Sequence, residues 1–158
     1  MFLGSDIDSR SKAKVAGILQ EALYDLSALS ALSKQARWNV VGPIFHALHF
    51  HLELMGSLLD RQIDEIAGAI VAIGFPPSGQ SAEIASHARI KPIPSGFLMD
   101  DQVICLIADR VHAFLLLNRD RQDDLQDIDI LTWDMLRRCS RAIEKQMWNL
   151  PTATHRVA

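Results

Sequence analysis

The stretch from Lys34 to Gly74, KQARWNVVGPIFHALHFHLELMGSLLDRQIDEIAGAIVAIG, decides how this chain folds. Its helical patterns are interrupted at Gly42-Pro43, where proline can begin a new helix because the N–H it lacks would be unpaired there anyway. Gly74 can take the left-handed conformation that closes a helix, and the two prolines that soon follow cannot continue one. We therefore predict a helix over 43–73, which is long for a globular domain.

Polar side chains form a stripe along this predicted helix. His49 and Glu53 are four residues apart, as are Asp60 and Asp64, and Glu53 and Asp64 are eleven apart. Four residues advance a helix by roughly 400° and eleven by roughly 1100°, so both steps return to nearly the same side. Such a stripe is either a solvated face or a metal site.

The two ends of this stripe cannot bind one ion within a single chain. His49 and Asp64 are fifteen residues apart, or about 22 Å along a helix. They can meet across a twofold axis if the helix packs antiparallel against its copy, with the axis near Ser57 to Leu59. Closed twofold dimers are the commonest oligomers, so this arrangement requires nothing unusual.

The segment Lys-Gln-Ala-Arg-Trp-Asn-Val-Val-Gly-Pro at 34–43, followed by His49-x3-Glu53 and Asp64, resembles the Dps family of mini-ferritins, the DNA-binding proteins from starved cells. The similarity extends over nearly the whole chain. It implies an all-α, ferritin-like four-helix bundle, with 1–158 as one domain, whose twofold dimers assemble into a hollow dodecameric shell. It also implies iron binding, oxidation of ferrous iron with peroxide, storage of the mineral and protection against oxidative stress.

The resemblance also assigns family metal-ligand positions, divided between two chains. The family pattern is His-Trp, then His-x3-Asp, then Asp-x3-Glu, and here these positions hold Arg37, His49, Glu53, Asp64 and Gly68. Iron(II) favours imidazole and carboxylate ligands, whereas arginine is permanently cationic and glycine has no side chain. We interpret Arg37 as a substitute for the metal, paired with Glu53 and with Asp64 of a neighbouring subunit.

Two functional hypotheses follow from these substitutions, and neither assigns a catalytic residue. In the first, His49, Glu53 and Asp64, with help from Asp60, still bind a single iron ion weakly, and ferroxidase activity is weakened or absent. In the second, the protein is a non-catalytic shell subunit, or a nucleoid-associated structural subunit, in which an arginine salt bridge replaces the metal.

Composition favours a soluble single domain, with 158 residues of which 49% are hydrophobic and 22% charged. The net charge of −3 gives no overall attraction to nucleic acid or to an anionic membrane, and the terminal segments are short and of mixed charge. DNA binding therefore has weak support. No export signal or bilayer-length apolar run is evident, which predicts a cytoplasmic protein, with nucleoid association as the alternative. Cys105 and Cys139 lack Cys-x-x-Cys spacing and are predicted to be reduced structural thiols.

Apolar periodicity elsewhere predicts helices at about 9–38, 100–119 and 128–148, in addition to 43–73. The connection 76–96 is long enough to be the single crossover of a ferritin-like bundle, with a short helix near 81–88. His51 is interpreted as a surface or interface histidine. The predicted break at 119–129 contains the densest group of acids, which form either a solvated turn or an acidic pore that concentrates cations: Asp123, Asp124, Asp127 and Asp129.

Overall fold

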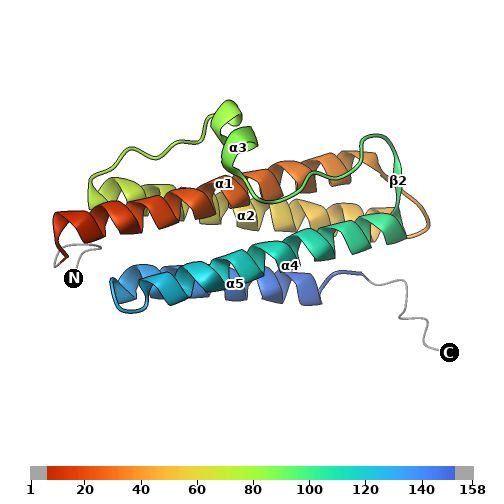
Figure 1. Ribbon diagram of the computed structural model, residues 1–158. Helices are drawn as coiled ribbons and strands as arrows, with labels where there is room; N and C mark the ends of the chain where they lie inside the picture. The colour runs from red at the N-terminus through yellow and green to blue at the C-terminus, as the bar shows by residue number, and fades with distance from the viewer. Residues whose placement is uncertain (1–6, 152–158) are drawn as a thin grey trace.

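A computed structural model of the chain describes residues 7–151 as a bundle of four long helices (Figure 1). The bounds are α1 Ser9–Asn39, β1 Val40–Val41, α2 Phe45–Ile73, α3 Ser81–His87, β2 Leu98–Met99, α4 Asp100–Leu125 and α5 Ile130–Trp148. Helix α2 runs back along α1, and the crossover carrying α3 returns the chain along the bundle to the start of α4. The predicted all-α four-helix bundle with one long crossover is confirmed, including the short helix within it.

The turn between α1 and α2 is fixed by contacts from far along the chain. Gly42 has a φ of +134°, and a side chain there would overlap the carboxylate of Asp100. That carboxylate accepts a hydrogen bond of 2.8 Å from the N–H of Ile44. The two-residue strands β1 and β2, which directly precede this turn and Asp100, pair in parallel. Asp100 therefore ties the start of α4 to the start of α2, which begins at Phe45, two residues later than predicted.

Helix α4 ends at Leu125, so the prediction that it stops near residue 119 is wrong. Arg121 and Leu125 are buried, while Asp123 and Asp124 are exposed on the other side of the same turns. The charged run is thus the solvated face of an amphipathic helix. The true connection is 126–129, and Asp129 caps α5 by accepting hydrogen bonds from the N–H of Leu131 and the hydroxyl of Thr132.

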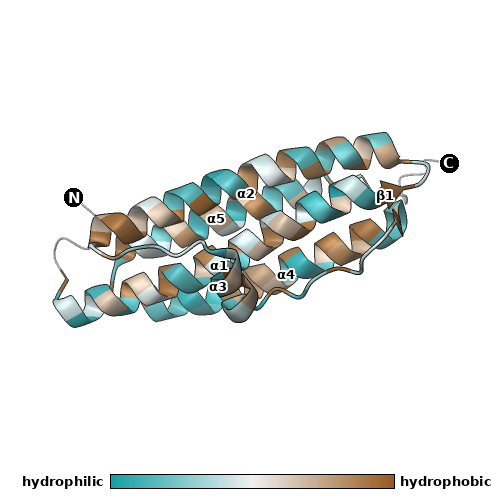
Figure 2. Cartoon of the chain, turned by 90° about the horizontal axis from the view of Figure 1, so that it is seen from above, coloured by the Kyte–Doolittle hydropathy of each residue, from teal (hydrophilic) through white to brown (hydrophobic). Residues whose placement is uncertain are grey.

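Apolar side chains from all four long helices form one core between them. Figure 2 shows hydrophobic and hydrophilic residues alternating along each helix, as the helical periodicity requires. The largest fully buried side chains are Phe114, Leu19, Leu26, Leu29, Leu48, Leu52, Met55, Leu59, Ile66, Ile70, Ile107 and Leu125. Each such side chain stabilises the fold by roughly 1.5–3 kcal/mol relative to exposure.

Burial shifts the pKa of two side chains of the bundle, Cys139 and His51. Cys139 is a free thiol, as is the exposed Cys105, and burial raises the pKa of Cys139 to about 12, which makes it unreactive. His51 is only 4% exposed, so the prediction of a surface histidine is wrong. The apolar spacing of α2 indicates this burial, because His51 follows Leu48 by three residues and precedes Met55 by four, and both of these side chains are buried.

A buried ion pair joins three segments in the bundle interior. The guanidinium of Arg121 on α4 donates to the carboxylate of Asp25 on α1, and both side chains are at least 97% buried. From the crossover, the N–H of Arg89 donates to Asp25 at 2.6 Å and its side chain pairs with Glu21 at 3.1 Å. The ring of Tyr24 stacks on His87 of α3 nearby. These contacts hold the crossover against α1.

Within 7–151, no helix is long and apolar enough to cross a membrane. The terminal segments 1–6 and 152–158, whose mixed charge gives DNA binding weak support, lie outside the described residues.

We expect Arg121→Met to lower the free energy of unfolding by about 3–5 kcal/mol, because it leaves the buried Asp25 carboxylate without its main cation. Chemical denaturation measures this change. Arg119→Met, on the exposed side of α4, is the matched control and is expected to change stability by no more than about 0.5 kcal/mol. Similar losses of unfolding free energy in the two variants would contradict the conclusion that Arg121 is needed to pair the buried carboxylate of Asp25.

Burial lowers the pKa of His51 below its ordinary value near 6.5. The unfolded chain therefore takes up a proton at a higher pH than the folded chain does, and stability falls as the pH decreases from about 6.5 toward the folded pKa. We expect His51→Leu to flatten this slope in thermal unfolding measured between about pH 7.5 and 5. An unchanged slope would assign the pH dependence to other groups.

Candidate metal centre

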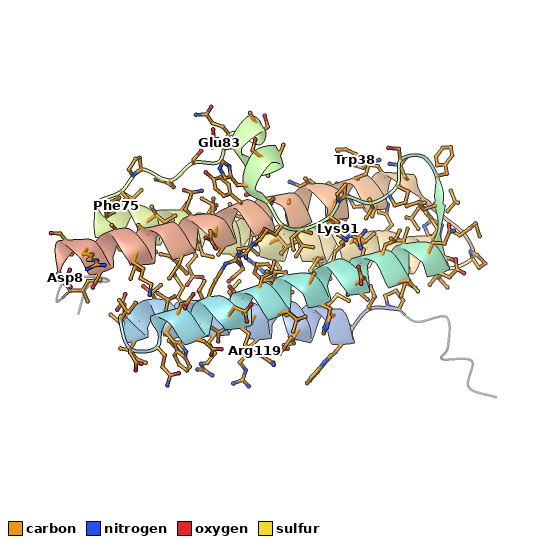
Figure 3. All side chains as sticks on the ribbon, viewed as in Figure 1. Asp8, Trp38, Phe75, Glu83, Lys91 and Arg119 are labelled. Atoms are coloured by element: carbon orange, nitrogen blue, oxygen red, sulfur yellow. The ribbon has the colours of Figure 1, made fainter. Side chains whose placement is uncertain are left out.

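Three of the predicted site residues, Arg37, Glu53 and Asp60, line one hollow where the last turns of α1 pack against α2. Trp38, labelled in Figure 3, lies in the last turn of α1 and shows where this part of the bundle is. Beside it, Arg37 projects toward α2, and its Nη1 lies 3.9 Å from Oε1 of Glu53. The Arg37 side chain is 26% exposed, and its Nε is buried without a hydrogen-bond partner. The structure thus places a cation beside Glu53 within one chain.

His49 is oriented by the backbone of α1. Its Nδ1 lies 3.2 Å from the carbonyl oxygen of Arg37, and its ring leans against Phe45 with 5.4 Å between centroids. Because a carbonyl can only accept, this contact selects the neutral tautomer in which Nδ1 carries the proton and Nε2 has the lone pair. Histidines that bind metals usually donate their other N–H to such a partner. His49 therefore retains the chemistry of a metal ligand.

Asp60 is bound by two side chains of α1. Lys34 lies 3.3 Å from one carboxylate oxygen, and the hydroxyl of Ser30 donates to the other at 2.8 Å. Sequence reasoning missed both partners, although Ser30, Lys34 and Arg37 follow one another at helical spacings of four and three, which predicts a shared face. Both carboxylate oxygens of Asp60 are thus already engaged by side chains of α1.

A hollow of about 210 Å³ separates these side chains. It is lined by Lys34, Arg37, Leu52, Glu53, Gly56, Ser57 and Asp60. The lining carries two cations and two carboxylates, so its formal charge is zero. A charge-balanced hollow attracts a metal cation far less than a set of carboxylates and imidazoles alone would.

The later positions of the stripe lie outside this hollow. Asp64 is exposed, and no cation pairs with it among residues 7–151. Gly68 is exposed too, with open space where a side chain would project. In the described part of the chain, no three histidine, cysteine or acidic side chains come close enough together to hold an ion.

The acids considered for a pore have different surroundings. Asp123 and Asp124 lie exposed in the last turn of α4, and Asp127 is exposed in the connection to α5. Asp129 is buried and serves as the cap of α5. Three of these four side chains therefore face solvent.

The protein has a ferritin-like domain, because the model of that family matches residues 16–157. The "DNA protection during starvation protein" of Agrobacterium fabrum is 30% identical over 147 residues, covering 92% of this chain and 91% of the relative. At this identity and coverage, the chain belongs to the Dps family.

Solved structures agree. Dps92 from Deinococcus radiodurans superposes with a TM-score of 0.86 at 29% identity, covering 90% of this chain and 86% of that one. Dps from Microbacterium arborescens in its high iron form gives a TM-score of 0.85 at 28% identity, covering 90% of this chain and 93% of that one. The family predicted from the sequence is confirmed.

Proposed function

We propose that this protein is a subunit of a hollow, homo-oligomeric Dps shell that binds and sequesters iron, with ferroxidase activity weakened or lost. The observation that carries the proposal is the 3.9 Å contact between Arg37 and Glu53. It sits where the family resemblance places the first histidine and the first carboxylate of the metal site. A fixed cation there occupies the space and the charge that iron would otherwise take.

The side chains that remain support weak binding of iron as a substrate. His49 presents Nε2 as a free acceptor, and Glu53 is more than half exposed and so accessible to an ion. Asp64 of a twofold-related subunit supplies the third ligand in the proposed arrangement. Because arginine stays protonated, an ion entering this site must overcome repulsion from Arg37 at every accessible pH.

The wider role follows from the same family membership. We propose a dodecameric shell that protects against oxidative stress by removing ferrous iron from solution in the cytoplasm. The exposed Asp123, Asp124 and Asp127 would attract cations if they face an opening between subunits. The net charge of −3 gives little support to DNA binding or to nucleoid association.

One observation favours the non-catalytic alternative. Glu53 and Asp60, the two carboxylates that line the hollow, each have a cation from α1 of the same chain, Arg37 and Lys34. A site whose acids are already neutralised can serve as an ionic contact within a structural shell subunit. In that case iron is neither bound nor oxidised there.

Restoring the two missing ligand types tests the proposal. Arg37→His with Gly68→Glu is expected to raise the rate of ferrous iron oxidation by about 10- to 100-fold over the wild type, because it removes a cation and adds two ligands. Gly68 has room for the new side chain. The rate is measured as ferric absorbance after ferrous iron and peroxide are added to the assembled protein.

Arg119→His with Gly17→Glu makes the same substitutions at exposed helical positions away from the site and is expected to retain the wild-type rate. A wild-type rate as high as that of the restored variant would contradict a weakened centre. A wild-type rate equal to that of buffer, with no iron retained after gel filtration, would select the non-catalytic alternative.

A further inference from the structure

A groove of about 350 Å³ lies between α2 and α5, whereas the hollow beside Arg37 lies between α2 and α1. The groove is lined by Leu54, Ser57, Leu58, Arg61, Ala142, Lys145, Gln146 and Asn149. No acidic side chain is among these residues, so Arg61 and Lys145 give the groove a formal charge of +2. The hollow, by contrast, is neutral. The groove is therefore suited to an anion.

The two cations of the groove are available to a ligand. Neither Arg61 nor Lys145 has an ion-pair partner among residues 7–151, although Arg138, further back on α5, has carboxylate partners. Arg141 lines an adjoining hollow with Lys145 and Glu144. Because Arg141 and Lys145 are four residues apart on one helix, their like charges repel each other. An anion bound beside them relieves this repulsion.

The polar groups of the groove match a phosphoryl group. Arginine presents several N–H donors in a plane that fits phosphate oxygens, and lysine adds a compact charge on a flexible stem. The side chains of Ser57, Gln146 and Asn149 add hydroxyl and amide donors, and they have no hydrogen-bond partner among residues 7–151. The two helices thus supply charge and directed donors to the same space.

The dipole of α5 opposes an anion here but does not outweigh the two cations. The C-terminal end of a helix corresponds to about half a negative charge. Two of the last carbonyl groups of α5, those of Gln146 and Met147, accept hydrogen bonds from the N–H groups of Asn149 and Leu150, at 3.3 and 3.0 Å. The two full positive charges of Arg61 and Lys145 therefore dominate the groove.

The rest of the lining is apolar. Leu54 is 44% exposed, and Leu58 and Ala142 are half-buried beside it. The volume of the groove is near the lower end for small-molecule sites, which begin at about 300 Å³. We infer that the groove binds a small phosphate monoester, with its phosphoryl group between Arg61 and Lys145 and its apolar body against the leucines. This site is independent of the iron chemistry proposed for the other side of α2.

Isothermal titration calorimetry on the assembled full-length protein tests the site with three probes. Iron is first removed with a chelator, because ferric iron would itself bind phosphate. Phenyl phosphate is expected to bind about tenfold more tightly than inorganic phosphate, because its ring is partly buried against apolar side chains. Phenol, which lacks the phosphoryl group, is expected not to bind. Equal dissociation constants for the two phosphates would overturn the assignment of an ester and leave a site for free phosphate.

Substitutions locate the binding. Arg61→Met and Lys145→Met are each expected to raise the dissociation constant of phenyl phosphate by about tenfold, and Arg61→Lys is expected to recover part of this loss. Arg119→Met removes one positive charge from an exposed position on α4 and is expected to keep the wild-type constant. Circular dichroism confirms that each variant is folded.

Three results would overturn the inference. The first is an absence of saturable binding of phenyl phosphate to the wild type. The second is an equal dissociation constant in Arg61→Met and Arg119→Met, which would show attraction to the overall charge of the protein instead of to the groove. The third is binding of phenol as tight as that of phenyl phosphate, which would show an apolar site without a role for the cations.

Discussion

The packing of α1 against α2 is the constraint on which the candidate site depends. Their apolar stripes meet in the core, and this contact brings the flanking polar faces of the two helices together along one seam. On that seam, Lys34 and Arg37 of α1 face Asp60 and Glu53 of α2. The charges are thus paired because hydrophobic burial fixes how the helices are aligned, and not because the pairs themselves contribute much stability.

The two sets of ion pairs in this protein differ in what they do. Arg121 and Asp25 are shielded from water, so their pairing is required once the charges are buried, and it fixes the crossover through Arg89. The pairs at the α1–α2 seam are 26–56% exposed, and such pairs typically contribute between about 0 and 1 kcal/mol. Their main effect is on the hollow, because two cations and two carboxylates leave its lining with no net formal charge.

In the proposed centre, Arg37 stands at a position that the family resemblance assigns to a metal ligand, while the ferritin-like fold is kept. A metal and a guanidinium both attract carboxylates and can both bridge two of them, so the helices can keep the same alignment with either. They differ in chemistry, because the guanidinium cannot exchange electrons or bind peroxide as iron does. In our proposal, a shell built on such pairs keeps its assembly while its reactivity with ferrous iron declines.

The sequence by itself determined the features that depend on neighbouring residues. Apolar periodicity located the four long helices, and Gly42-Pro43 and Gly74 marked the ends of the second. Spacings of four and eleven placed His49, Glu53, Asp60 and Asp64 on one face of that helix. Helical geometry repeats over a few residues, so these features can be read locally.

Only the tertiary structure decided the features that depend on contacts between distant segments. The end of α4 at Leu125 follows from burial of its apolar side against the bundle, the role of Asp100 from its hydrogen bond to Ile44, and the occupation of Asp60 from Ser30 and Lys34 on another helix. Many residues of the chain are chemically suitable partners for a given charge or hydrogen-bond donor. Long-range packing determines which of them lies within contact distance.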